Sequence, residues 1–322
     1  GVTMIDRSLL EGGLARMGRL KASASDSRDS QLARELALAR VDAVLCEIVA
    51  EGERLETELR AKARRMVDDH AFGNLERVAG AANDAELDAT AKQLAEWWKL
   101  PGFEADAGRW QEEAKNAIDD WFHRSADQLE RTINSPQFRA VMAGAGTSCD
   151  PASVGRPPQG WLGRLVNLVA QPLRGATRNV VYWVGKNLGH RFRPWGAVKL
   201  AKLLGRVGVV LGVVATVVDA VSLYRSWKGE KRRQALRKEL RGFVEQTAKE
   251  VLASLADGNE EAAGPITYLQ VIQGHICDAA RDLGAERQVI QSDLKAIEKR
   301  LAAYELCMNK AWSALGLKGS NI

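Results

Sequence analysis

Apolar residues recur every three or four positions over residues 30–70, which is the spacing of one face of an α-helix. Acidic and basic side chains share the other face, so the sequence predicts one amphipathic helix from about Ser30 to His70. A helix of about forty residues spans roughly 60 Å at 1.5 Å per residue, which suits a rod or stalk better than one side of a compact globule. Its apolar stripe consists of Leu38, Val41, Leu45, Ile48, Gly52, Leu55, Leu59 and Met66.

Further helices follow from the same spacing. One is expected at about 84–99 and ends at Pro101-Gly102, a stop signal; the next is expected at about 104–134. Pro136 then fits the first position of a new helix that Ser135 caps. The last helix, at about 285–315, is expected to pack antiparallel on the first or third. Its heptad-like seam is Ile290, Leu294, Ile297, Leu301, Tyr304, Met308 and Leu315.

These helices predict an all-α fold, an elongated and stalk-like antiparallel bundle with an inserted basic, apolar helical tip region. Residues 1–143 form its N-terminal arm, and residues 144–160 are a linker dense in Gly, Pro and Ser. Residues 161–257 form the basic apolar region, with the tip and a returning helix. Residues 258–322, in which Gly264-Pro265 begins a new element, form a C-terminal arm that packs on the N-terminal arm.

Composition agrees with a helical chain, because Pro and aromatic residues are scarce and helix-forming residues abound. The four cysteines are scattered and suggest no disulfide framework, which favours a reducing compartment. The N-terminus has no basic stretch followed by an apolar one, so no signal peptide is visible. Gly1 in place of Met suggests a tag remnant or a fragment, and a missing upstream domain stays open.

Charge is concentrated in residues 156–241, called the basic segment below. It holds eighteen Lys and Arg against three acids, a net charge of +15 in a chain whose total is +5. Within it, residues 207–218 carry no charge. A positive field around an apolar stretch is what a protein needs to meet an anionic membrane.

The apolar run has three interpretations. It is short for a bilayer span of about 20 residues, and Asp219 would be costly in lipid, which argues against a constitutive span. Gly208 and Gly212 fit close helix packing in a membrane and equally in a soluble core. Burial as the central helix of a bundle and conditional contact with a membrane therefore both stay open.

Aromatic residues interleave with the bases, which suits a lipid interface and also suits stacking on single-stranded nucleic acid. The adjoining apolar run favours lipid, because a nucleic-acid groove does not require one. The candidate membrane-contact residues are Arg174, Arg178, Trp183, Lys186, Arg191, Phe192, Arg193, Trp195, Lys199, Lys202, Val209, Val210, Leu211, Val213, Val214, Trp227 and Lys228.

The sequence contains no convincing motif for nucleotide binding, metal binding or catalysis. The sequence has no GxxxxGK[ST] phosphate loop, and its four histidines are isolated along the chain. His275 and Cys277 fall on different faces of a helix, so packing or capping is expected there rather than a metal. The Ser-x-x-Lys match at Ser292 lies mid-helix, and the pair Asp119-Asp120 reads as a solvated helix face. We expect no catalytic site, no cofactor and no metal.

The segment Val180–Asp219 resembles the C-terminal part of LeoA-type bacterial dynamin-like proteins. The core of the similarity is Gly185-Lys186, then Phe192-Arg-Pro-Trp-Gly-Ala-Val-Lys-Leu-Ala201, then the Gly-rich apolar stretch that ends at Asp219. The resemblance implies a large GTPase with a helical stalk and a tip, linked to membrane remodelling or vesicle-associated secretion. Because this chain has no GTPase motif, the GTPase domain lies upstream or on a partner, and no nucleotide-binding residue is carried over.

The function that follows is a non-catalytic helical stalk and membrane-contacting module of a bacterial dynamin-like protein. Its expected partners are an anionic membrane surface, a GTPase domain or GTPase partner, and further copies of the chain; nucleic acid is the weaker expectation. The expected location is cytoplasmic and peripheral to a membrane. The alternatives are a helical pore-forming toxin or effector with a concealed apolar hairpin, and a helical nucleic-acid-binding protein.

Overall fold

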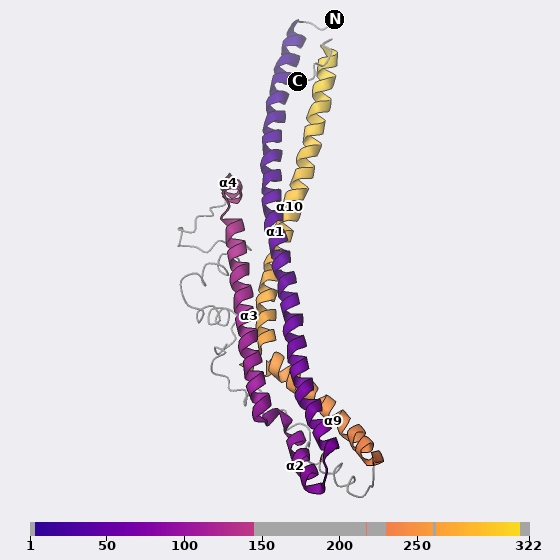
Figure 1. Cartoon of the computed structure of the whole chain (residues 1–322). Coiled ribbons are helices and arrows are strands. Elements are labelled where there is room, and N and C mark those ends of the chain that lie inside the picture. Colours follow the sequence, from indigo (N-terminus) through magenta and orange to yellow (C-terminus); the bar gives the residue numbers. More distant parts are fainter. Residues whose placement is uncertain (1–3, 145–216, 218–229, 260–261, 316–322) are drawn as a thin grey trace. The chain divides into compact units, whose positions relative to one another are not determined.

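The computed structural model describes residues 4–144, 217, 230–259 and 262–315. Over these residues the fold is all-α, as the sequence predicted, apart from one pairing of two-residue strands (Figure 1). The elements are α1 (Met4–Gly80), α2 (Asp84–Ala95), the 3₁₀ turn η1 (Trp97–Lys99), α3 (Pro101–Ile133), α4 (Pro136–Gly144), α9 (Glu230–Ala256), β1 (Gly258–Asn259), β2 (Ala262–Ala263) and α10 (Pro265–Ala314).

The chain divides into two compact units, and three of its helices contribute residues to both. Unit 1 comprises Gly1–Glu47, Ala126–Val169 and Ile276–Ile322. Unit 2 comprises Ile48–Ser125 and Ala170–His275. Residues 145–160 of the predicted linker lie outside the described residues, as do residues 161–229 of the predicted basic apolar region, apart from Val217.

In unit 1 the first part of α1 lies antiparallel to the later part of α10, which confirms the predicted antiparallel packing of helices (Figure 1). Lys21 pairs with Glu305 at 3.1 Å, whereas Asp42 pairs with Arg287 at 2.5 Å, so positions advance along α1 as they retreat along α10. The seam of α10 supplies buried Ile290 to this contact. The unit's other buried apolar residues include Leu38, Val41, Leu45, Leu129, Phe138, Ile276, Leu283 and Leu301.

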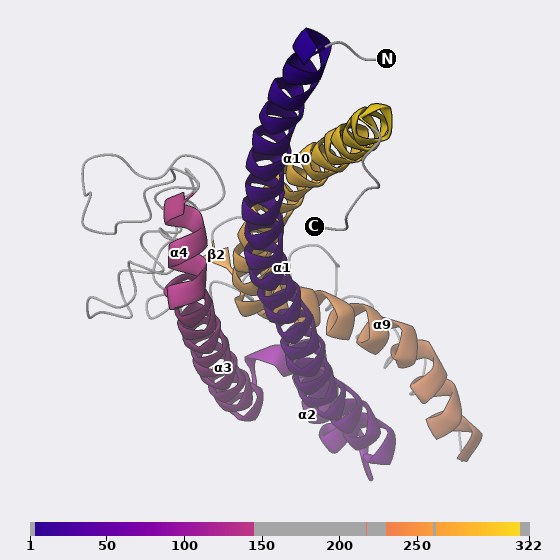
Figure 2. The ribbon, with the colours of Figure 1, turned by 90° about the horizontal axis from the view of Figure 1, so that it is seen from above.

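In unit 2 the later part of α1 packs antiparallel to both α3 and α9. The indole Nε1 of Trp110 on α3 donates to the carbonyl of Leu59 at 3.2 Å, while His70 contacts Asp106 nearer the start of α3. Figure 2 shows the end of α9 next to α1, from which the helix runs outward toward its start. In this unit the apolar side of α3 contributes buried Trp110, Ala114, Ile118, Trp121 and Phe122.

The first helix is much longer than its apolar stripe predicts. It begins at Met4 rather than about Ser30 and continues to Gly80. Residues 22–30 are mostly Ser, Ala and charged residues, so the apolar periodicity stops there although no proline interrupts the helix. α10 lies alongside the start of this stretch, where Lys21 pairs with Glu305 at 3.1 Å.

Other boundaries depart from the prediction for local reasons. The helix expected at 84–99 is α2 followed by η1, whose Trp97 and Trp98 side chains are buried. η1 ends at Lys99, and Pro101 is the first residue of α3, a position that a proline's missing N–H does not disfavour. The element that begins at Pro265 is the start of the last helix itself, because α10 runs unbroken from there to Ala314.

Candidate functional site

All seventeen candidate membrane-contact residues lie outside the described residues. Apart from Val217, the described part of the basic segment is the first half of α9, residues 230–241. The structure therefore shows how the basic segment is attached to unit 2 through α9.

α9 is anchored on unit 2 by a buried apolar stripe. Leu240, Val244, Val251 and Leu255 are fully buried and recur at helical spacing, so they lie on one face of α9. The stripe also includes Thr247, whose hydroxyl donates to the carbonyl of Phe243 at 3.0 Å. Burying this face gives α9 a fixed position against the other helices of the unit.

Each end of α9 is joined to α1 by an ion pair. Near its start Arg237 pairs with Glu76, and just after its end Asp257 pairs with Arg60 at 2.7 Å. The Arg237–Glu76 pair is exposed, with side chains 49% and 58% accessible, so it contributes little to stability. The two pairs show that α9 runs antiparallel to this part of α1.

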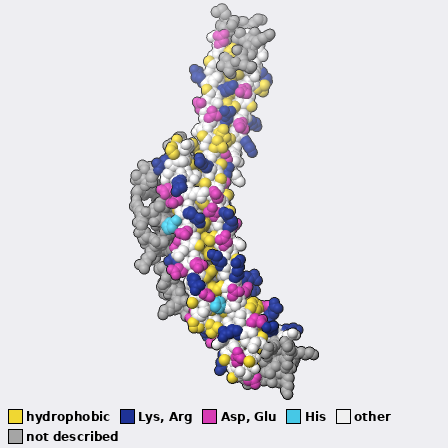
Figure 3. Space-filling view, in the orientation of Figure 1, with side chains coloured by type: hydrophobic (Ala, Val, Ile, Leu, Met, Phe, Trp, Pro, Cys, Tyr) yellow, Lys and Arg dark blue, Asp and Glu magenta, His cyan; other side chains and the backbone are white. Residues whose placement is uncertain are grey.

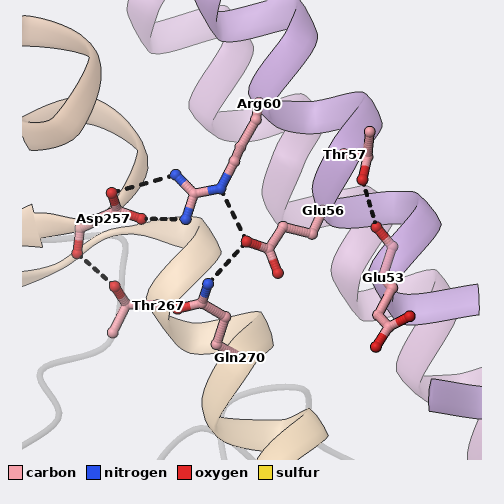
Figure 4. Close-up of polar contacts among 7 residues, drawn as sticks. All are labelled: Glu53, Glu56, Thr57, Arg60, Asp257, Thr267 and Gln270. Carbon is pink, nitrogen blue, oxygen red and sulfur yellow. Dashed lines mark hydrogen bonds and ion pairs between the residues drawn. The ribbon is translucent and has the colours of Figure 1, made fainter. Parts of the chain in front are cut away.

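The pair at the end of α9 belongs to a larger polar group, here called the Arg60 network (Figure 4). Arg60 donates from both terminal nitrogens to Asp257, at 2.7 and 3.3 Å, and from Nε to Glu56 at 2.9 Å. The amide of Gln270 on α10 donates to the same Glu56 oxygen at 2.8 Å. The hydrogen bond with Asp257 is the main reason why the pKa of Arg60 is raised. The network connects α1 with the corner between α9 and α10.

That corner requires glycine at two positions. Gly258 has a φ of 87°, in the left-handed region that L side chains rarely adopt. A Cβ on Gly264 would lie 2.3 Å from the carbonyl oxygen of Ala256 and 2.6 Å from the nitrogen of Gly258, so only glycine fits. The corner is closed by two hydrogen bonds to the carbonyl of Asp257. The Gly264 nitrogen donates one at 2.8 Å, and the Thr267 hydroxyl donates the other at 2.7 Å, as drawn in Figure 4.

Aromatic side chains fill the core beside α9. Trp97 meets Trp98 edge to face with centroids 5.9 Å apart, and meets Phe103 in the same way at 5.0 Å. The indole Nε1 of Trp97 donates to the hydroxyl of Thr247 on α9 at 3.3 Å, and His70 packs edge to face on Phe103 at 5.4 Å. η1 thus contributes two buried tryptophans to the core beside α9, and one of them, Trp97, bonds to α9 directly.

Gly52 allows a close approach on α1. A Cβ there would lie 2.5 Å from Nε2 of Gln273 and 2.9 Å from the Trp121 ring. Trp121 is 1% exposed and Gln273 is 8% exposed, so both side chains are held in the core of unit 2 at this glycine. Periodicity placed Gly52 in the apolar stripe, but it could not show that the absence of a side chain is what matters there.

Asp119 does not lie on a solvated face as the sequence suggested; it is half-buried, whereas its neighbour Asp120 is exposed. Burial raises the pKa of Asp119, and Lys115 and His123 partly oppose that rise. Tyr268 is 4% exposed, and burial together with the charge of Asp119 raises the pKa of its hydroxyl well above the ordinary value.

Two of the described histidines, His70 and His123, contact neighbouring side chains. His70 Nε2 lies 3.0 Å from a carboxylate oxygen of Asp106, and His123 packs against Phe122 with centroids 6.2 Å apart. Cys277 and Ser292 lie within α10, Ser292 mid-helix as predicted. In the parts of the chain that the structure describes, no three His, Cys, Asp or Glu side chains are grouped so as to hold a metal ion.

Acidic and basic side chains are interspersed on the face shown in Figure 3, over the helices that the structure describes. None of those helices combines the length and the hydropathy that crossing a bilayer takes.

Comparison with known proteins gives a family match for one region of this chain. Residues 170–303 match the family model of the dynamin-like helical domain. No curated protein and no solved structure gave a significant match. The matched region begins within the basic segment and includes α9, the corner and most of α10. It is therefore a dynamin-like helical region, and the predicted resemblance is confirmed to that extent.

Sequence reasoning located the basic segment but missed how it is attached. Arg60, Glu76 and Asp257 are each ordinary charged residues on a helical pattern, and their pairing joins positions 161 or more residues apart. A partial signal is available at the corner, because the turn-forming residues Asp257-Gly258-Asn259 directly follow the end of α9. Nothing in a single sequence indicates which distant arginine such an aspartate meets.

Proposed function

We propose that this chain is a non-catalytic helical stalk and membrane-contacting module of a bacterial dynamin-like protein of the LeoA type. The observation that carries the proposal is the match of residues 170–303 to the dynamin-like helical domain, together with the position of the basic segment at its start. The chemistry of membrane remodelling would come from a GTPase, on the same polypeptide or on a partner.

The charge distribution supports the membrane role. The basic segment carries a net charge of +15, and each Lys or Arg near an anionic lipid surface contributes about 1 kcal/mol of attraction. Its aromatic residues and the uncharged run 207–218 add side chains that suit the headgroup level and the acyl boundary. This combination favours a peripheral contact with the membrane.

The described helices support a mechanical role. The stripe and ion pairs of α9 tie the chain just after the basic segment to α1, and the Arg60 network ties the end of α9 to α10. In this proposal, force or displacement at a lipid contact passes through α9 into the helices of unit 2. Assembly with further copies of the chain belongs to the same proposal.

Sedimentation with liposomes tests the proposal. The chain is mixed with vesicles of neutral phosphatidylcholine and with vesicles containing about 30% phosphatidylserine, at low and high salt. We expect co-sedimentation with the anionic vesicles alone, and its loss at high salt. The proposal is contradicted if the chain does not bind, or if its binding does not depend on lipid charge and salt concentration.

Two further readouts separate the alternatives. Dye release from the same vesicles, with no nucleotide and no partner, would instead indicate a pore-forming toxin or effector. Salt-sensitive retention of DNA or RNA by a chain without lipid affinity would indicate a nucleic-acid-binding protein.

A further inference from the structure

Three bases near the start of α9 lie exposed on one side of the helix. Arg237, Lys238 and Arg241 are spaced i, i+1 and i+4, which places them within about 100° of arc at 100° per residue. The side chains of Arg237 and Arg241 are 49% and 69% accessible, and Lys238 is exposed. We call these three residues the α9 basic face.

The α9 basic face continues the basic segment directly. α9 begins at Glu230, and residues 230–241 hold six bases and two acids, Glu230 and Glu239. Unlike the seventeen candidate residues, the α9 basic face has a known position, because the buried stripe of the same helix is packed into unit 2.

Two carboxylates already neutralise part of this face. Glu76 on α1 pairs with Arg237, and Glu245, one turn further along α9, accepts from Arg241 Nε at 2.8 Å. Both pairs are exposed, with the carboxylates 58% and 54% accessible, so water and other anions compete with them readily. A phosphate is a strong competitor, because a guanidinium binds phosphate and carboxylate oxygens in the same forked geometry.

We propose that the α9 basic face is part of the surface that contacts anionic lipid headgroups, and that Glu76 competes with lipid phosphate for Arg237. This inference rests on the proposed membrane function and extends it to a described helix. When lipid binds, Arg237 exchanges Glu76 for a headgroup phosphate. The ion pair that orients the start of α9 on α1 is then lost, while the buried stripe keeps the helix in place.

The test compares two double variants of the whole chain. K238E/R241E reverses two charges on the α9 basic face, and K62E/R65E reverses two exposed charges on α1 within the same unit. Both change the net charge of the chain equally, so they separate a local contact from overall charge. Circular dichroism and thermal melting verify that each variant folds.

Binding is measured as the partition onto vesicles containing phosphatidylserine. Each base lost from a lipid contact costs about fivefold in partition, so K238E/R241E should bind at least about 25-fold more weakly than wild type. K62E/R65E should change partition by a few-fold at most. If both variants lose vesicle binding equally, or if K238E/R241E loses none, the inference is overturned. The proposed function still stands in either case, provided that the wild type binds anionic vesicles.

Glu76→Gln tests the competition separately. Removing the carboxylate frees Arg237 at little structural cost, so partition should rise about two- to fivefold at low salt. Unchanged or weaker partition overturns the competition. If wild type itself fails to bind anionic vesicles, the proposed function fails; if K238E/R241E loses DNA binding but keeps vesicle binding, the lipid assignment is overturned.

Discussion

At the scale of single residues, Asp119 shows how local burial changes a reading made from spacing. On α3 it follows buried Ile118 and precedes exposed Asp120, so it lies at the edge of the core rather than on the solvent side. Its ionised form loses hydration there, and Lys115 and His123 restore only part of that loss. Asp119 therefore costs the folded state free energy at neutral pH.

Asp119→Asn should raise the free energy of unfolding at pH 7, which makes the protein more stable, and should leave it unchanged at low pH. The raised pKa means that the contribution of Asp119 to stability is fully present below its ordinary pKa and is lost as pH rises through its folded-state pKa. Urea denaturation of both proteins at pH 3 to 8 measures the difference. A gap that does not widen with pH would contradict this account, and exposed Asp120→Asn is the matched control.

At the scale of elements, Arg287 joins α10 to α1 in unit 1 through several polar contacts. Arg287 donates to Glu35 at 2.9 and 3.3 Å and to Asp42 at 2.5 Å, and Gln291 donates to Glu35 at 3.0 Å. Glu35 is 13% exposed and Arg287 is 23% exposed, so water screens these charges only partly. The hydrogen bonds from Arg287 and Gln291 lower the pKa of Glu35.

Replacing Arg287 by Met should destabilise unit 1 by about 2 kcal/mol, because two partly buried carboxylates then face each other without a cation. Glu35 has a lowered pKa, so its contribution to stability is present above its ordinary pKa and is lost as pH falls through the folded-state value. The variant should therefore lose part of the wild type's sensitivity to acid below about pH 4.

The measurement is thermal or urea unfolding of Arg287→Met across that pH range. Arg281→Met, which removes an exposed i,i+3 pair with Asp278 on the same helix, should change stability by less than about 0.5 kcal/mol. Adding Glu35→Gln and Asp42→Asn to Arg287→Met should recover part of the loss. If the Arg281 and Arg287 variants are equally stable, the Arg287 pairs contribute no more to stability than an exposed ion pair does.

How much of this fold was visible in the sequence depends on how each element is held. α3 was predicted well because its buried Trp110, Ile118 and Trp121 follow helical spacing. The first 26 residues of α1 escaped prediction because their pattern carries no continuous apolar stripe, although they are helical. The turn η1 was not predicted, because its conformation depends on the burial of two tryptophans and not on a periodic pattern. The candidate site divides in the same way, since composition reveals the bases of α9 but not the carboxylate of Glu76 beside them.

At the scale of the whole molecule, buried side chains are distributed unevenly between the two units. On α1, no residue from 15 to 37 is buried, and Leu32 and Leu36 are 45% and 60% exposed. On α10, buried Ile290 and Leu301 are separated by ten residues, none of them buried. Unit 2 instead contains the tryptophan-rich core around η1, α3 and α9. Stability should follow this distribution, because opening free energies track buried apolar contacts.

Hydrogen–deuterium exchange should therefore divide α1 into two parts. Amides of residues 15–37 should exchange within minutes, whereas those of residues 59–78, which include buried Leu59, Val67 and Val78, should be protected at least about 100-fold more. In α10, peptides after Leu301 should exchange faster than those around Leu269 and Ile272. Peptide-resolved mass spectrometry at neutral pH makes the measurement, and Arg287→Met should speed exchange in residues 15–47 without changing residues 59–78. Uniform protection along α1 would mean that burial of its own side chains does not set its local stability.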